Sequence, residues 1–244
     1  MILLLQFFLA HILGDFFLQS SKWVASKELK KWRSPYLYIH IFIHFTLILL
    51  VTWDLRLWRV ALVISVLHLL IDTIKLQYQQ PATQRAWFFI DQIAHLVVLL
   101  WVWSFYEHVT WNYTTIVTPR ALIISTAVLF ALKPASLITK FAISKWTPGT
   151  SASSSSTTTG EIESLKNAGE WIGFLERLMI LIFILLGKWE GVGFLLAAKS
   201  VFRFGDLKEP RETKLTEYVV IGTFLSFFIA ILTGIITSQL LEMP

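Results

Sequence analysis

Five of the six histidines in this chain of 244 residues share one spacing with another histidine or with an aspartate. Four apolar segments each carry two such side chains four positions apart, and the pairs are His11 and Asp15, His40 and His44, His68 and Asp72, and Asp91 and His95. Residues four apart lie on one face of a helix, so each pair can direct two side chains at one point. The sixth histidine, His108, follows Glu107, and we expect both in a solvated loop.

Imidazole and carboxylate groups in this arrangement are typical of divalent metal sites. The chain has no cysteine, which excludes thiolate ligands, disulfides and cysteine nucleophiles. Eight side chains exceed the four ligands of one tetrahedral zinc. They therefore predict either two metals bridged by a carboxylate, or one metal whose histidine ligands are oriented by further carboxylates. Zinc suits these donors best, with Mn or Fe as alternatives. Simple hydrogen bonding between helices would explain a single pair better than it explains four.

The segments that carry the pairs are apolar enough to cross a membrane. Hydrophobic residues make up 55% of the chain and charged residues 15%, against about 25% charged in ordinary globular domains. This balance excludes a cytoplasmic enzyme, a nucleic-acid-binding domain and a disordered chain. We therefore predict an all-α, polytopic membrane helical bundle of about eight transmembrane helices. The expected spans are Ile2–Gln19, Tyr36–Trp53, Leu57–Lys75, Trp87–Tyr106, Arg120–Ile143, Ala168–Gly187, Glu190–Phe204 and Glu217–Leu241, or seven if the short seventh segment is re-entrant.

The distribution of positive charge predicts the orientation of these spans. With the N-terminus outside, sixteen Lys and Arg residues fall on inner segments and four on outer ones (Arg56, Arg59, Arg120 and Lys188), as the positive-inside rule requires. This orientation places one layer of the pairs near the cytoplasmic surface, consisting of Asp15, His40, Asp72 and Asp91. The other layer lies one turn deeper, about 6 Å along the helix rise, and consists of His11, His44, His68 and His95.

A stretch rich in serine and threonine divides the chain. Residues 147–166 cannot bury a core and predict a flexible linker. Residues 1–146 before it form the expected N-terminal transmembrane bundle with the metal-type site. Residues 167–244 after it form a C-terminal unit of three spans.

Further polar side chains near the span ends could support the site. Three side chains near the pairs are expected to hydrogen-bond the metal ligands or to contact an anion, namely Gln19, Lys75 and Gln92. In the C-terminal unit, a phosphate or lipid headgroup could be held by Arg177, Lys199 and Arg203. Structural pairing of Arg177 with Glu176 or Glu217 is the competing interpretation.

Several sequence motifs contain these residues, namely H-I-L-G-D-F-F-L-Q at His11–Gln19, H-L-L-I-D-T-I-K at His68–Lys75, F-I-D-Q-I-A-H at Phe89–His95, G-F-L-E-R at Gly173–Arg177, G-F-L-L-A-A-K-S-V-F-R-F at Gly193–Phe204 and E-Y-V-V-I-G-T at Glu217–Thr223. With these motifs the chain resembles the family catalogued as domain of unknown function 3307, over nearly its whole length outside the linker. The resemblance implies a multi-pass protein of the bacterial inner membrane, from a bacterium or a phage, and implies no activity. The His/Asp pattern is also broadly similar to membrane-bound metal-dependent hydrolases, in ligand type alone.

These observations favour a metal-dependent hydrolase that acts on a lipid or lipid-linked substrate at the inner leaflet. Asp91 or Asp15 could act as general base on a metal-activated water. The expected partners are membrane lipids, and no nucleic acid. A divalent metal transporter, a di-iron membrane oxidase or hydroxylase, and a partner protein with a structural metal are the alternatives. The sequence leaves the oligomeric state open.

Overall fold

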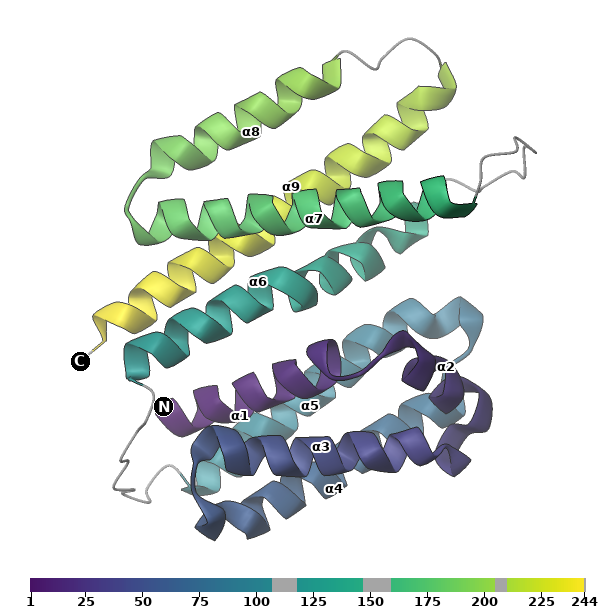
Figure 1. Ribbon diagram of the computed structural model, residues 1–244, viewed down its shortest axis with the longest axis vertical. Coiled ribbons are helices and arrows are strands. Elements are labelled where there is room, and N and C mark those ends of the chain that lie inside the picture. The colour runs from purple at the N-terminus through teal and green to yellow at the C-terminus, as the bar shows by residue number, and fades with distance from the viewer. Residues whose placement is uncertain (107–117, 147–158, 205–209, 244) are drawn as a thin grey trace. The chain divides into compact units, whose positions relative to one another are not determined.

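The structure is a computed structural model that describes residues 1–106, 118–146, 159–204 and 210–243. Every regular element in these ranges is a helix (Figure 1), which confirms the all-α prediction. The α-helices are α1 (Ile2–Ile12), α2 (Ser21–Lys30), α3 (Pro35–Thr52), α4 (Trp58–Tyr78), α5 (Gln84–Tyr106), α6 (Pro119–Ile143), α7 (Thr159–Leu185), α8 (Trp189–Phe204) and α9 (Pro210–Glu242).

The described chain forms two compact units, Met1–Thr126 and Ala127–Pro244, so that α6 contributes to both. The predicted division at residues 147–166 stays a prediction, because 147–158 lie outside the described residues. The last part of that predicted linker belongs to α7, which begins at Thr159.

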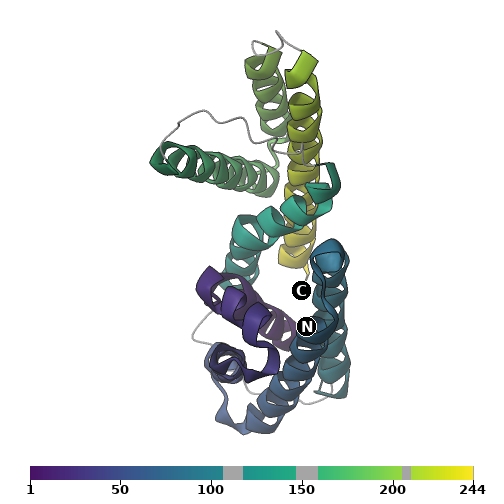
Figure 2. The same ribbon diagram turned by 90° about the vertical axis from the view of Figure 1, so that its right-hand side faces the viewer.

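Unit 1 is a closed ring of four helices. α1 packs against α3 and α5, and α4 packs against α3 and α5 (Figures 1 and 2). One end of the ring is filled by apolar side chains from all four helices, namely Leu3, Phe7, Ala10, Ile48, Leu57, Val60, Ala61, Ile64, Leu99 and Val102. The paired His and Asp residues come from the next turns of the same helices, so the ring directs all of them inward.

A local irregularity ends the first helix beside the pairs. The last turn after α1 is a π-helix (Leu13–Phe17), in which the Leu18 amide donates to the Leu13 carbonyl at 2.9 Å. Such turns occur mostly as single insertions near functional sites. Ser20 then caps α2, because its side chain accepts a hydrogen bond from the Trp23 amide. The chain turns by 84° between the two segments, so α2 crosses the end of the bundle.

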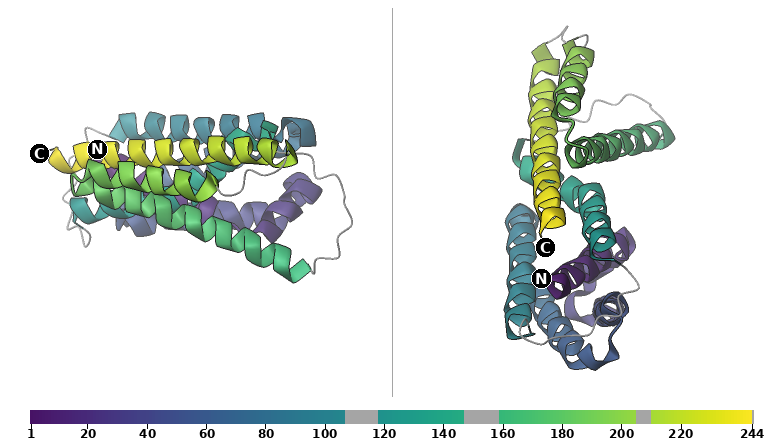
Figure 3. Two further views of the ribbon diagram at one scale, coloured as in Figure 1. Left: turned by 90° about the horizontal axis from the view of Figure 1, so that it is seen from above. Right: turned by 90° about the vertical axis from the view of Figure 1, so that its left-hand side faces the viewer.

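Unit 2 contains α7, α8 and α9, and α7 packs against both of the others (Figures 1 and 3). The turn between α7 and α8 uses Gly187 in a left-handed conformation with φ of 67°, which glycine adopts at little cost. The apolar core of the three helices consists of Ile180, Ile184, Val192, Phe227 and Ala230.

Fewer helices than expected are long and apolar enough to cross a membrane. Five pass this test among the described residues: Pro35–Thr52, Leu55–Tyr78, Pro81–Tyr106, Pro119–Trp146 and Glu217–Glu242. The bent pair of Ile2–Phe17 and Ser21–Arg33 makes a sixth if it is one span. The prediction of about eight is therefore not supported. α7 carries Glu170, Glu176 and Arg177 within its apolar part, and α8, with 16 residues, is shorter than the roughly 20 residues that a span needs.

Candidate metal centre

All eight paired residues lie together inside unit 1, with two contributed by each of the four helical segments of the ring. Seven of them are buried, and the exception, Asp15, has a side chain that is 12% exposed. The buried residues are His11, His40, His44, His68, Asp72, Asp91 and His95.

Asp15 is at the centre of the cluster, where three histidines surround one of its oxygens. Asp15 Oδ1 lies 2.9 Å from His44 Nε2, 3.3 Å from His40 Nε2 and 3.4 Å from His68 Nε2. The Nε2 atoms of His40 and His68 are 3.2 Å apart. A tetrahedral ion with bonds of 2.0–2.1 Å separates its ligand atoms by about 3.3 Å. These four distances are close to that separation, and two groups of residues each have ligand atoms within 4.8 Å of one another: His11, Asp15, His44 and His68, and His40, His68 and Asp72.

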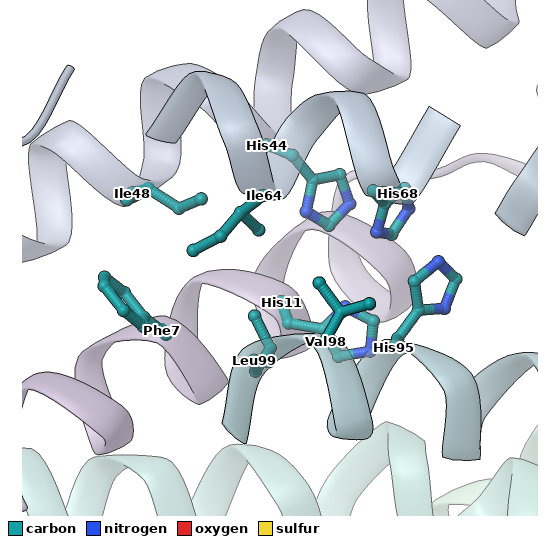
Figure 4. A pocket seen from close by; sticks show the side chains of 9 residues that line it. All are labelled: Phe7, His11, His44, Ile48, Ile64, His68, His95, Val98 and Leu99. Carbon is teal, nitrogen blue, oxygen red and sulfur yellow. The ribbon is translucent and has the colours of Figure 1, made fainter. Parts of the chain in front are cut away.

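The four histidines of the predicted deeper layer have their rings in contact. The ring centroids of His44 and His68 are 4.0 Å apart, those of His68 and His95 3.9 Å, and those of His11 and His95 5.1 Å. The rings gather at one end of a small cavity, as Figure 4 shows. Its volume of about 10 Å³ is near the minimum for one water molecule. The rest of its wall is apolar and consists of Phe7, Ile48, Ile64, Val98 and Leu99.

Two lysines neutralise carboxylates of the other layer. Lys27 Nζ donates to Asp72 Oδ2 at 3.0 Å, and Lys75 Nζ donates to Asp91 Oδ2 at 2.8 Å. The spacing in the sequence predicts Lys75 near the site but gives no sign of Lys27. Lys27 lies on α2 and reaches the cluster only because the chain bends before that helix, and no spacing in the sequence signals this bend.

Gln92 joins three of the predicted ligands. Its Nε2 donates to Asp15 Oδ2 at 3.2 Å and to Asp91 Oδ2 at 3.1 Å, while its Oε1 lies 3.4 Å from His11 Nε2. Gln92 can therefore orient two carboxylates and a histidine together. Gln19 differs, because no hydrogen bond within the described residues joins its side chain to the cluster.

Some buried polar atoms of the cluster have no hydrogen-bond partner within the described residues. They are Nδ1 of His40, Oδ1 of Asp91, and both ring nitrogens of His95. Nearly all buried polar groups in proteins are paired, because an unpaired one loses the energy of its contacts with water. These atoms are therefore free to bind a ligand.

Gly14 allows one histidine to reach the centre. A Cβ atom at Gly14 would lie 2.4 Å from both Cε1 and Nε2 of His44, which is far inside van der Waals contact. The ring of His44 thus packs directly on the backbone of the π-helical turn. Sequence reasoning did not single out this glycine, although it lies inside the motif His11–Gln19.

Two of the predicted anion contacts of the C-terminal half have partners within unit 2. Within unit 2, Arg177 donates to the carbonyls of Ala131 and Leu132 and to Ser226 Oγ. Both carbonyls lie on α6 shortly before Pro134, which has no amide hydrogen and so removes the helical donor of the Phe130 carbonyl. The donors of Arg177 are therefore used by groups of unit 2.

Lys199 also has a structural partner in unit 2. Its ammonium group donates to Glu176 Oε2. Arg203 lies on α8, but its side chain is outside the part of the chain that the structure describes. His108 and Glu107, expected in a solvated loop, also lie outside the described residues.

Comparison with known proteins places the N-terminal half in one family. No curated protein and no solved structure matches the chain. One family model matches residues 3–124, which include the motifs at His11–Gln19, His68–Lys75 and Phe89–His95, while the motifs from Gly173 onward lie outside the match. The chain belongs to the family described as Protein of unknown function (DUF3307).

Proposed function

We propose that the cluster in unit 1 binds a divalent metal ion, and that the protein is a membrane-embedded metal-dependent hydrolase. The observation that carries this proposal is the convergence of three histidine Nε2 atoms on Asp15 Oδ1, at 2.9 to 3.4 Å. The proposed ligands are Asp15, His44 and His68, whose ligand atoms lie within 4.8 Å of one another, together with His40, which contacts Asp15 and His68. Zinc fits nitrogen and carboxylate donors at this spacing best, and Mn or Fe are the alternatives.

The chemistry of such a site is hydrolysis. A bound divalent ion lowers the pKa of a coordinated water towards 7 and polarises a carbonyl or phosphoryl oxygen. Asp91 is better placed than Asp15 to accept the proton of that water, because its Oδ1 atom has no partner within the described residues. Gln92 keeps both carboxylates in position.

The substrate in this proposal is a lipid or lipid-linked molecule. The most exposed members of the site, Lys75 at 25% and Asp15 at 12%, belong to the layer that the charge distribution predicts near the cytoplasm. With the N-terminus outside a bacterial inner membrane, that end of the bundle faces the inner leaflet, where a headgroup can approach it. The transporter alternative is weaker, because Phe7, Ile48 and Ile64 close the other side of the histidine cavity and a conduction path needs polar walls.

Metal analysis of the full chain, extracted in mild detergent without chelator, tests the proposal. We expect at least one Zn, Mn or Fe per chain in the wild type and its loss in His68→Ala. Thr52→Val is the matched control, because Thr52 is buried on α3 but bonds only backbone carbonyls of its own helix. Wild-type protein that holds no metal, and takes up none when zinc is added, would overturn the metal site.

The reaction needs its own test. Incubated with vesicles of bacterial phospholipids, wild type and Thr52→Val should release water-soluble headgroup or fatty acid, and His68→Ala should release none. Metal binding without any release would overturn the hydrolase. Iron with an oxygen-sensitive absorption band would then indicate an oxidase, and metal flux into proteoliposomes would indicate a transporter.

A further inference from the structure

We infer that the cluster contains a second metal site, formed by His95, Asp91 and Oδ2 of Asp15, and that Asp15 bridges it to the first. The inference rests on the proposed function, because the first site must bind metal for a bridge to have meaning. It goes further by assigning Asp91 and His95 to a second site and by assigning each oxygen of Asp15 to one of the two sites.

The two oxygens of Asp15 have different surroundings. Oδ1 contacts the three histidines of the first site. Oδ2 instead accepts a hydrogen bond from Gln92 and lies 3.8 Å from His11 Nε2. A carboxylate whose oxygens contact separate sets of ligands is the usual bridge in sites where two ions lie about 3.5–4 Å apart.

A group of possible ligands surrounds the Oδ2 side. Asp15, Asp91 and His95 each offer one ligand atom, and these three atoms lie within 4.8 Å of one another. His11 belongs to the group of Asp15, His44 and His68, although its ring lies 5.1 Å from that of His95. The group on the Oδ2 side contains three ligands, which is enough to hold an ion with water or substrate in the remaining positions.

The unpartnered atoms are an independent observation that points to the same place. His95 is only 2% exposed, yet neither of its ring nitrogens has a hydrogen-bond partner among the described residues. Asp91 uses Oδ2 to accept from Lys75 and Gln92, while its buried Oδ1 accepts nothing. If His95 served only in packing, an apolar side chain would serve as well and would bury no polar atoms. His95 Nδ1 lies 3.9 Å from Asp91 Oδ2, and an ion bound by His95 that also reached the neighbouring Oδ1 would satisfy both residues.

Charge predicts that the second ion binds more weakly than the first. The cluster contains three carboxylates (Asp15, Asp72 and Asp91) and two ammonium groups (Lys27 and Lys75), a net charge of −1 when the histidines are neutral ligands. One divalent ion brings the net charge to +1, so the second approaches a positive site. When both ions are bound, Asp91 Oδ1 would be a metal ligand and not the general base. The two ions would then activate the water that Asp91 would otherwise deprotonate.

A titration of the metal-free full chain in detergent with Co²⁺ tests the second site. Calorimetry should give two Co²⁺ per chain in the wild type, the second bound at least about tenfold more weakly, which is about 1.4 kcal/mol. His95→Phe, which keeps the ring volume, and Asp91→Asn should each bind one Co²⁺. Their first affinity should stay within about threefold of the wild-type value, and Thr52→Val should keep both ions.

The outcomes separate this inference from the proposed function. A wild type that binds one Co²⁺ overturns the second site and leaves the first standing, and a wild type that binds none overturns both. Two ions retained in both His95→Phe and Asp91→Asn would overturn the assignment of ligands. Loss of both ions from His95→Phe, with helical content and thermal unfolding unchanged, would show that His95 belongs to the first site.

Discussion

Both units of this protein bury ionisable side chains, but they satisfy them differently. In unit 2, Arg177 donates to two carbonyls and a hydroxyl, and Glu176 accepts from Lys199. In unit 1, histidines and carboxylates crowd around Asp15, while the ring nitrogens of His95 and one oxygen of Asp91 have no hydrogen-bond partner in the described chain.

The difference distinguishes a structural network from a binding site. A buried charge whose donors are all used stabilises one arrangement of helices and has little left to offer a ligand. Some buried ligand atoms lie close together without enough hydrogen-bond donors to satisfy them. Such atoms lower the stability of the protein without metal, and a bound cation can recover that loss. Substitutions in the two units should therefore separate stability from metal binding.

The largest expected effect is on the stability of unit 2. Arg177→Leu leaves the carbonyls of Ala131 and Leu132 and the Ser226 hydroxyl without their donor, which should cost about 3–5 kcal/mol of unfolding free energy. Chemical unfolding in detergent measures this loss, and Arg120→Leu, at an exposed position of α6, should change it by less than about 0.5 kcal/mol. Metal content per folded chain should not change. A loss of metal from folded Arg177→Leu would contradict the separation of the two networks.

The next effect compares an ion-paired lysine from each unit, namely buried Lys27 and Lys199, whose side chain is 27% exposed. Lys27→Met leaves the carboxylate of Asp72 uncompensated and should destabilise the metal-free protein by about 3 kcal/mol. Zinc should restore most of that loss, because the ion then supplies the missing positive charge. Thermal unfolding with chelator and with zinc measures both effects.

Lys199→Met is the control, because it breaks the corresponding pair with Glu176 in unit 2. It should lower the unfolding temperature equally with chelator and with zinc. If zinc rescued the two variants alike, it would be acting on the whole protein and not on the cluster.

Gly14→Ala should reduce metal affinity with less effect on folding. The added methyl group would overlap the His44 ring, so the ring must move away from Asp15. We expect zinc affinity to fall about 100-fold, or about 2.7 kcal/mol, as measured by competition with a chelating dye. Gly193→Ala on α8 is the control, because a Cβ there meets nothing within 4 Å and should leave affinity unchanged. Equal affinities in the two variants would contradict the role of Gly14.

The convergence of the eight residues could be predicted from the sequence because two simple regularities determine it. A spacing of four fixes the face of a helix, and the bias of positive charge fixes direction, so His11 and His95 could be placed in one layer although they are distant in the chain. The structure brings these two rings into contact.

The contacts that the sequence analysis missed depend on changes of chain direction. Lys27 reaches Asp72 because the chain turns by 84° before α2, and hydrophobic periodicity contains no information about such a bend. The partners of Arg177 are backbone carbonyls, which no residue type identifies, and the expected acidic partner Glu176 pairs with Lys199 instead. The predicted count of about eight spans, or seven with the short seventh segment re-entrant, exceeds the five or six found, because hydrophobicity alone does not account for the three charged residues within the apolar part of α7.

The smallest expected effect concerns single hydrogen bonds, compared at Gln92 in unit 1 and Ser226 in unit 2. Gln92→Leu removes the amide that donates to Asp15 and Asp91. Because residues that orient metal ligands contribute about 10- to 100-fold to affinity, zinc should bind about tenfold more weakly, with little change in unfolding. Ser226→Ala removes one acceptor of Arg177 and should cost about 1 kcal/mol of stability without changing zinc affinity. If both variants altered stability and neither altered affinity, the polar groups of unit 1 would be as structural as those of unit 2.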